Sequence, residues 1–260
     1  MSAPDEAGRA VRSSGGWRER WTVLLHQVER VHSAQEEDAL LARLAQPERP
    51  CVLAFANASA MNHAVGSAAF FDSLHGADTV LRDGSGMAVL YRMLDLAPGR
   101  NLNGTDFIPR LVRAFNGRSI ALFGTCEPYL SRALTTIDRT LAPNSPQCMA
   151  HGFLETEAYV ALAIERHPEL IVLGMGMPRQ EEVAAALRRA LSHPCLIVCG
   201  GAIIDFLGGR TPRAPEWMRG MGLEWLHRLG HEPRRLFRRY VLGNPVFLAR
   251  AMRLSRTRRG

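Results

Sequence analysis

The chain has 260 residues, of which 47% are hydrophobic and 22% are charged. This composition excludes general disorder, and the length suffices for one large domain with a buried core. Because no apolar run reaches the roughly 18 residues that span a bilayer, and the first residues lack an apolar signal region, we expect neither an integral membrane protein nor a secreted one. Five scattered cysteines without zinc-type spacing favour a reducing, cytosolic setting.

Charge is distributed unevenly along the chain. All 32 basic residues are arginines, which excludes chemistry that needs a Schiff-base or phosphate-binding lysine. From residue 210 to the end, 13 arginines face Glu216, Glu224 and Glu232, a net charge of +10; since the whole chain carries +7, the remainder carries −3. A mildly acidic body with a strongly basic C-terminal segment predicts an anionic partner, such as nucleic acid, lipid headgroups or a diphosphate.

In chain order, a disordered tail is expected over residues 1–16, followed by alternating strands and helices. Six segments are predicted as strands, most of them short apolar runs that end at Gly, Asn or Asp: 51–57, 79–82, 119–124, 147–150, 170–174 and 195–200. Helices are clearest at 155–166 and 178–191. The alternation predicts an α/β fold over residues 17–209, with a Rossmann-like, doubly wound and mainly parallel sheet.

The pattern changes near residue 210, where 211–215 is a stiff segment with two prolines. One helix is predicted over 216–230, because apolar residues recur there every four positions: Trp217, Met221, Trp225 and Leu229. Pro233 and Pro245 then begin two further short helices that carry most of the arginines. We therefore expect residues 210–260 to form a basic helical appendage on the α/β core.

Polar residues and glycines follow five of the predicted strands, at the edge where doubly wound sheets bind ligands. These residues are Asn57, Asp83, Gly124, Gly174 with Gly176, and Gly200 with Gly201. Any one of them can be explained as a turn former, but five successive strand ends predict the rim of one site. Asp83 lies in a glycine-flanked turn and is a candidate general base, although an Asp there can also cap a turn.

The loop that begins at Gly174 is a candidate phosphate site. Gly174 and Gly176 match the first half of a dinucleotide-binding G-x-G-x-x-G, but Arg179 replaces the third glycine, so nicotinamide or flavin binding is disfavoured. A nucleotide diphosphate fits better, because backbone amides, the start of the next helix and Arg179 can all face phosphate. Gln180 can bind a sugar or base. No cofactor is predicted.

Metal ligands are poorly supported by the sequence. The nine histidines form no metal-binding pattern, and the chain has no D-x-D pair of the kind that holds a divalent ion on a diphosphate. If the protein transfers a sugar, we expect arginines rather than a metal ion to balance the charge of the leaving diphosphate. The basic C-terminal segment can supply them.

Together, these motifs occur in the order found in a known family. They are D-G-x-G at 83–86, G-T-D-F at 104–107, L-F-G at 122–124, G-M-G-M-P-R-Q-E at 174–181, G-G-A-x-x-D at 200–205, R-A-P-x-W at 213–217, G-L-E-W-L-x-R-L at 222–229 and E-P-R-R at 232–235. From about residue 52 to 239, the chain resembles the WecG/TagA/CpsF family of bacterial glycosyltransferases.

The resemblance implies an inverting, metal-independent transfer of a sugar from a UDP-sugar to a saccharide linked to undecaprenyl diphosphate. It implies that Asp83 is the general base and that the C-terminal segment docks on the anionic inner face of the cell membrane, where it places arginines over the donor diphosphate. A homo-oligomer is compatible with the sequence. The predicted substrate-binding residues are Asn57, Asn103, Asp106, Gly124, Gly174, Gly176, Arg179, Gln180, Gly200, Gly201, Arg210, Arg228 and Arg235.

Two positions depart from the family pattern. Phe55 stands where many members carry Thr, and Asn101 stands where many carry Arg, with Arg100 beside it. The donor sugar therefore stays open among N-acetylmannosamine, its uronic acid and glucose, and the product among exopolysaccharide and other cell-surface polysaccharides. Two other functions remain as alternatives: nucleic-acid binding through the arginines, which the few aromatic residues of the segment disfavour, and a non-catalytic scaffold of a polysaccharide assembly complex.

Overall fold

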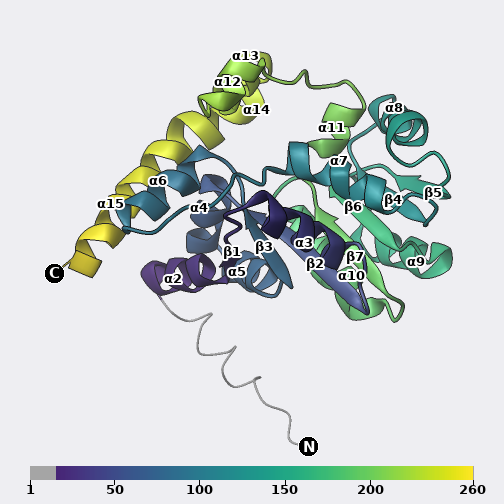
Figure 1. The fold of residues 1–260 in the computed structure, drawn as a ribbon, viewed down its shortest axis with the longest axis horizontal. Helices are drawn as coiled ribbons and strands as arrows, with labels where there is room; N and C mark the ends of the chain where they lie inside the picture. The colour runs from purple at the N-terminus through teal and green to yellow at the C-terminus, as the bar shows by residue number, and fades with distance from the viewer. Residues whose placement is uncertain (1–15, 260) are drawn as a thin grey trace, which may run out of the picture.

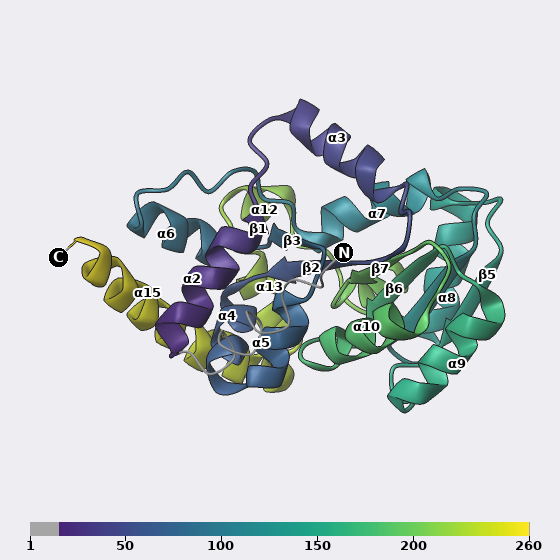
Figure 2. The ribbon, with the colours of Figure 1, turned by 90° about the horizontal axis from the view of Figure 1, so that it is seen from below.

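The protein folds around one parallel sheet with helices on both faces (Figures 1 and 2). The computed structural model describes residues 16–259, so the predicted disordered tail lies outside the described residues except for Gly16. The described strands are β1 Val28–Glu29, β2 Pro50–Ala56, β3 Thr79–Arg82, β4 Ile120–Gly124, β5 Gln147–Ala150, β6 Leu170–Gly174 and β7 Cys195–Cys199. Their order is β1-β3-β2-β7-β6-β4-β5, and every neighbouring pair is parallel. The predicted α/β fold is confirmed.

Two hydrophobic cores lie on the two faces of the sheet. Along β2, Val52, Ala54 and Ala56 belong to one core, whereas Leu53 and Phe55 belong to the other. A strand covered on both faces needs apolar residues at every position, which is why these strands appear in the sequence as continuous apolar runs.

Helices from different parts of the chain cover each face. The first face carries α2 Trp17–Gln27, α4 Ala58–Gly66, α5 Ala68–His75, α6 Ser85–Met93, α9 Thr156–Arg166 and α10 Arg179–Ala190. The second face carries α3 Ala34–Leu44, α7 Gly104–Ala114, α8 Tyr129–Thr136 with a π-helical turn η1 Ile137–Leu141, and α11 Ile203–Leu207. Figure 2 shows these two helical layers on either side of the sheet.

The C-terminal segment is helical, but it is divided differently from the expectation. It contains α12 Glu216–Gly220, α13 Glu224–His231, α14 Pro233–Phe237, a π-helical turn η2 Arg238–Leu242 and α15 Gly243–Arg259. The single helix predicted over 216–230 is wrong. Gly222 has a φ of +71°, which lies outside the helical region, and the chain turns there between α12 and α13.

The two parts of this segment pack differently. Phe247, Ala251 and Leu254 of α15 are buried in the first core, and the ring of Phe247 lies 5.3 Å from that of Trp21 in α2, as the adjacency of α2 and α15 in Figure 2 shows. By contrast, residues 211–242, called here the crossing segment, bury only three side chains: Thr211, Ala214 and Leu236. Thus α15 is part of the body of the protein, whereas the crossing segment lies on it.

Candidate active site

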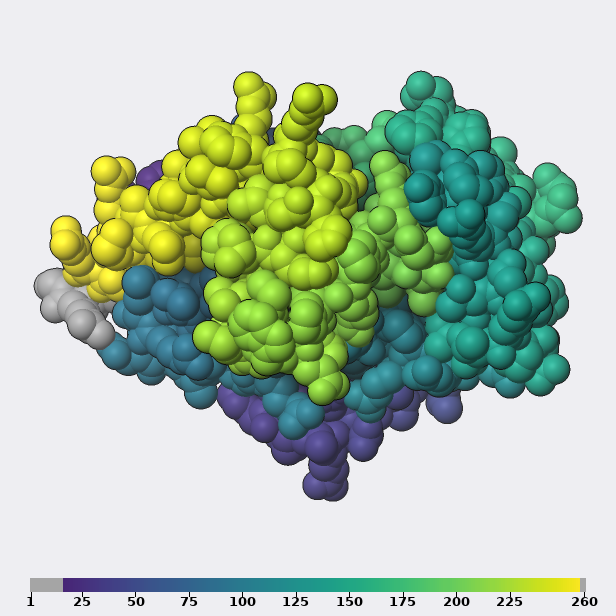
Figure 3. Space-filling view, turned by 90° about the horizontal axis from the view of Figure 1, so that it is seen from above, coloured from purple at the N-terminus to yellow at the C-terminus, as the bar shows by residue number. Residues whose placement is uncertain are grey.

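A cavity of about 810 Å³ lies at the carboxyl ends of the central strands, and the crossing segment forms one of its sides. Figure 3 shows the crossing segment over this edge of the molecule, between α15 and the region of α8. The sheet has two halves that meet where β2 pairs with β7: β1, β3 and β2 form one half, and β7, β6, β4 and β5 form the other. After β3 the chain crosses from the first half to β4 in the second half, so the strand order switches between β2 and β7. Ligands bind at such a switch in strand order in doubly wound sheets, so the cavity lies where the sequence predicted a site.

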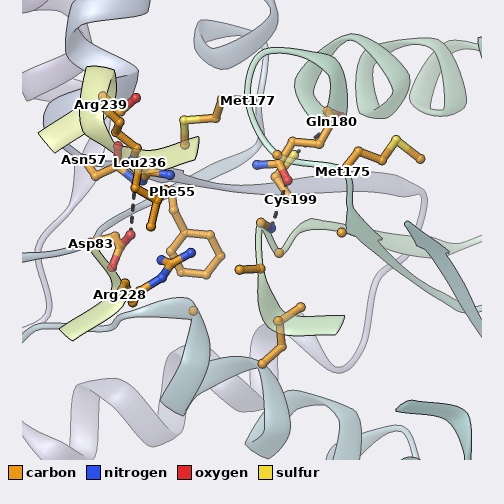
Figure 4. Close-up of a pocket in the computed structure, with 18 of the residues that line it drawn as sticks. Phe55, Asn57, Asp83, Met175, Met177, Gln180, Cys199, Arg228, Leu236 and Arg239 are labelled. Carbon is orange, nitrogen blue, oxygen red and sulfur yellow. Dashed lines mark hydrogen bonds between the residues drawn. The ribbon is translucent and has the colours of Figure 1, made fainter. Parts of the chain in front are cut away.

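Asp83 and Asn57 line this cavity at the ends of β3 and β2. Asn57 caps α4, because its Oδ1 accepts a hydrogen bond from the amide of Ala60 at 3.0 Å. Its Nδ2 donates to Oδ2 of Asp83 at 3.2 Å (Figure 4). Among the described residues, no other side chain forms a hydrogen bond or ion pair with this carboxylate. One oxygen of Asp83 is therefore oriented by Asn57, and the other is available to a substrate hydroxyl.

The turn that carries Asp83 is supported by two polar side chains. Arg82 is buried, and its guanidinium donates to the carbonyl of Gly84 at 3.0 Å and to two carbonyls of residues 98–99 at 2.9 and 3.1 Å. The Oδ1 of Asn101 accepts a hydrogen bond from the amide of Gly84 at 2.9 Å. These contacts fix the backbone that follows Asp83, so the fold itself sets the position of the carboxylate.

The structure also places the residues that depart from the family pattern. Phe55 lines the cavity with its ring and offers no hydroxyl. Arg100 donates from Nε to Oε2 of Glu37 at 2.8 Å, on the second face of the sheet, and it does not line the cavity. Arg100 therefore does not bring a charge to the site in place of an arginine at Asn101.

Gln180 lines the cavity but has partners within the protein. It is buried, its Oε1 accepts a hydrogen bond from the amide of Gly201 at 2.9 Å, and its Nε2 donates to Glu181 at 2.8 Å. Burial raises the pKa of Glu181 to about 7, although the hydrogen bond from Gln180 lowers it. This side chain thus joins the loop after β6 to the loop after β7, a role that the sequence did not predict.

The glycines of these two loops line the cavity, as predicted: Gly174, Gly176, Gly200 and Gly201. Packing also requires a glycine at position 174, because a Cβ there would lie 2.6 Å from the side chain of Ile204. The absence of side chains lets a ligand approach the backbone, but the amides of Gly200 and Gly201 already donate hydrogen bonds within the protein. At Gly174 the fold alone already explains the residue.

Four predicted site residues lie outside the cavity lining: Asp106, Gly124, Arg179 and Arg210. A Cβ at Gly124 would lie 2.5 Å from the backbone of Gly174, so this glycine allows β4 and β6 to approach each other. Arg179 donates to the carbonyl of Leu154. The guanidinium of Arg210 lies 3.5 Å from the buried carboxylate of Asp205.

Asp106 connects the core to the crossing segment. Asn103, which does line the cavity, caps α7 and donates to Asp106 at 2.8 Å. Arg213 and Arg219 of the crossing segment lie 2.7 and 3.7 Å from the same carboxylate. Burial alone would raise the pKa of Asp106, but the hydrogen bonds from Arg213 and Asn103 outweigh this effect and lower it. Asp106 therefore fixes one end of the crossing segment over the cavity.

Among the described residues, the arginines that line the cavity all come from the crossing segment: Arg228, Arg235, Arg238 and Arg239. The guanidinium of Arg228 lies 5.5 Å from the ring of Phe206 in α11. Arg235 of α14 lies 3.9 Å from Asp205, which is also in α11, and 2.5 Å from Glu232. The sequence predicted Arg228 and Arg235 but missed Arg238 and Arg239, since spacing does not distinguish them from the other arginines.

Glu224 is a further cavity residue that the sequence did not predict. It lies on α13, and its carboxylate forms no hydrogen bond or ion pair with any other described residue. Burial raises its pKa; the charge of Arg213 lowers it, and the charge of Asp83 raises it further. The cavity is therefore lined by three carboxylates, Asp83 and Asp205 from the core and Glu224 from the crossing segment, together with the arginines named above.

A model of the Glycosyl transferase WecG/TagA/CpsF family matches residues 21–260. The chain belongs to this family. Among curated members, the N-acetylglucosaminyldiphosphoundecaprenol N-acetyl-beta-D-mannosaminyltransferase of Bacillus subtilis strain 168 is 26% identical over 62% of this chain and 63% of that protein, just under two thirds of its length. The protein of the same name from Staphylococcus aureus strain MW2 is 23% identical over 77% of this chain and 79% of its own.

Residues 16–259 contain neither a cluster of candidate metal ligands nor a membrane-spanning helix. No cluster of three or more His, Cys, Asp or Glu side chains in this range is suited to hold a metal ion. No helix in the same range has both the length and the apolar character needed to cross a bilayer. Metal independence and membrane association both stay predictions.

Proposed function

We propose that this family member is an inverting, metal-independent glycosyltransferase that moves a sugar from a UDP-sugar to a saccharide on undecaprenyl diphosphate, in exopolysaccharide or cell-surface polysaccharide synthesis. Family membership supports sugar transfer, and the two relatives named above support the lipid-linked acceptor, since their name specifies N-acetylglucosaminyldiphosphoundecaprenol. The donor candidates remain N-acetylmannosamine, its uronic acid and glucose.

The observation that carries this proposal is an oriented carboxylate in a cavity lined with arginines (Figure 4). Asp83 accepts the proton of the acceptor hydroxyl while the oxygen of that hydroxyl attacks the anomeric carbon of the donor sugar. The bond from that carbon to the UDP oxygen breaks, and UDP leaves with the electron pair. A single displacement of this kind inverts the anomeric configuration. Arg228 and Arg235 then balance the charge that develops on the diphosphate.

We also propose that the crossing segment and α15 dock on the anionic inner face of the cell membrane, so that the protein is cytoplasmic and peripheral. Large apolar side chains are exposed along these elements: Trp217, Met221, Leu226, Phe237, Val241, Leu242, Val246, Leu248 and Met252. Exposed apolar groups among arginines suit an interface with anionic lipid, where each arginine contributes on the order of 1 kcal/mol. A homo-oligomer is compatible with this arrangement.

A panel of UDP-sugars and short-chain lipid-diphosphate saccharides tests the proposed function. We expect one donor to give a lengthened product in which NMR shows the opposite anomeric configuration to that of the donor. If UDP binds but no combination gives a product, the protein is a scaffold. If UDP does not bind and RNA binds in a salt-sensitive manner, the protein is a nucleic-acid-binding protein.

A further inference from the structure

The proposed reaction brings two diphosphates to one cavity, one on the donor and one on the lipid-linked acceptor. We propose that they occupy different subsites, and that Arg239 is the cation that binds the acceptor diphosphate. This inference rests on the proposed function and adds the location of the second substrate. It follows from where the cavity arginines lie.

The first cationic group lies over α11, beside the loop that follows β7. Arg228 is placed there by the ring of Phe206 at 5.5 Å, and Arg235 by Asp205 at 3.9 Å. Gly200 and Gly201, which precede α11, line the cavity on the same side. We assign this group of arginines, beside the glycine loop, to the donor diphosphate as its subsite.

Arg239 lies on another side of the cavity, toward α4 and the start of α10. Burial lowers the pKa of His63 in α4, and the charge of Arg239 lowers it further. The same charge also acts on Glu181 in α10, where it lowers a pKa that burial raises. In Figure 4, Arg239 enters near Asn57 and Arg228 enters from the opposite side, with Asp83 between them in this view.

Arg239 also has unused binding capacity. Its guanidinium lies 5.4 Å from the ring of Tyr240, but no carboxylate among the described residues pairs with it. Its Nε is buried in the described structure without a hydrogen-bond partner. A buried donor without a partner costs free energy unless a ligand satisfies it, and a phosphate oxygen is a strong acceptor for a guanidinium.

The surroundings of Arg239 suit a lipid diphosphate. Arg239 lies in η2, and that turn and the residue before it expose Phe237, Val241 and Leu242, with 50%, 40% and 54% of their surfaces accessible. A lipid whose diphosphate contacts Arg239 can therefore place the start of its hydrocarbon chain against these side chains. The cavity volume of about 810 Å³ lies in the upper part of the roughly 300–1,000 Å³ that single ligands occupy, which leaves room for groups of two substrates.

Calorimetry with two probes, UDP and geranyl diphosphate, tests this inference on the full chain. We expect the wild-type protein to bind geranyl diphosphate in the presence of saturating UDP. Arg239→Gln should weaken geranyl diphosphate binding by about 10- to 100-fold and leave UDP binding unchanged. Unchanged UDP binding also shows that the variant is folded. Arg239→Lys should retain part of the affinity, because it keeps the charge.

The matched control is Arg234→Gln, since Arg234 is an exposed arginine of α14 that does not line the cavity. It should alter neither affinity. The inference is overturned if UDP displaces geranyl diphosphate, if the wild-type protein does not bind geranyl diphosphate, or if Arg239→Gln weakens UDP binding equally. If Arg239→Gln loses binding to phosphatidylglycerol vesicles but still binds geranyl diphosphate like the wild type, Arg239 belongs to the membrane surface instead. If both probes bind as expected but no sugar is transferred, the proposed function fails separately.

Discussion

Asp83→Asn separates the basicity of this side chain from its shape. In the wild-type protein, Nδ2 of Asn57 donates to Oδ2 of Asp83 at 3.2 Å, and an amide oxygen in place of the carboxylate oxygen can accept the same bond. The contacts of Arg82 and Asn101 to the turn involve backbone atoms, so they persist. Only the capacity to accept a proton is lost. Turnover should therefore fall by about 10² to 10⁴, which corresponds to about 2.7 to 5.5 kcal/mol of transition-state stabilisation.

The assay measures initial rates at saturating donor and acceptor, with UDP affinity measured by calorimetry. UDP affinity should stay within about twofold, because the change removes no contact to the diphosphate. Glu224→Gln is the matched control, since it neutralises another carboxylate of the cavity, one that pairs with no arginine among the described residues, and we expect it to lower turnover by less than about tenfold. A wild-type rate for Asp83→Asn, or an equal loss for both variants, would refute the assignment of Asp83 as the base.

Three further predictions concern the metal, the membrane and the core. Activity should survive EDTA if, as we propose, arginines rather than a metal ion balance the charge of the leaving group; a loss restored by Mg²⁺ or Mn²⁺ would contradict this. Joint replacement of Phe237 and Leu242 by Asp should weaken binding to anionic vesicles by about tenfold or more in a sedimentation assay, and unchanged binding would place the docking surface elsewhere. Phe247→Ala should lower the free energy of unfolding by about 3–5 kcal/mol in urea titrations, because this ring is buried against Trp21; a loss below about 1 kcal/mol would show that α15 is not part of the core.

The central strands were predictable because burial on both faces leaves a strong signal in the sequence. The structure places β3 and β6 at the predicted residues, and β2, β4 and β7 within one residue at each end. Strand β1 was missed, since it has only two residues and exists through its pairing of Val28 with Val80 and Glu29 with Leu81. Such a strand is defined by its neighbour rather than by its own sequence.

The interruption of the helix over 216–230 has a similar origin. The four-residue apolar spacing is present, but the hydroxyl of Ser85 donates to the carbonyl of Gly222 at 3.3 Å, a contact made across the fold. Spacing along the chain carries no information about such a contact. The available signal was the pair Gly220 and Gly222 within the pattern, because glycine weakens a helix and tolerates a positive φ.

Within the candidate site, the residues at strand ends were easier to predict than the arginines. Asn57 and Asp83 could be placed together because parallel strands end at a common edge. Arg179 is as close to the glycine loop in sequence as any arginine, yet it binds the carbonyl of Leu154. Arg239, far from that loop in sequence, lines the cavity. Which arginine reaches a cavity depends on how distant segments pack, and a single sequence does not record it.

The packing of α15 against α2 has a consequence for how the protein is made. Trp21 is translated long before its partner Phe247, with the whole sheet between them in the sequence. The apolar surface that α15 covers therefore stays exposed until that helix is made, and chaperones and proteases bind exposed apolar surfaces. A ribosome that stalls before α15 releases a chain with the complete sheet and Asp83 but without the helix that closes its core. Cellular quality control can thus discard copies of the protein that lack this helix.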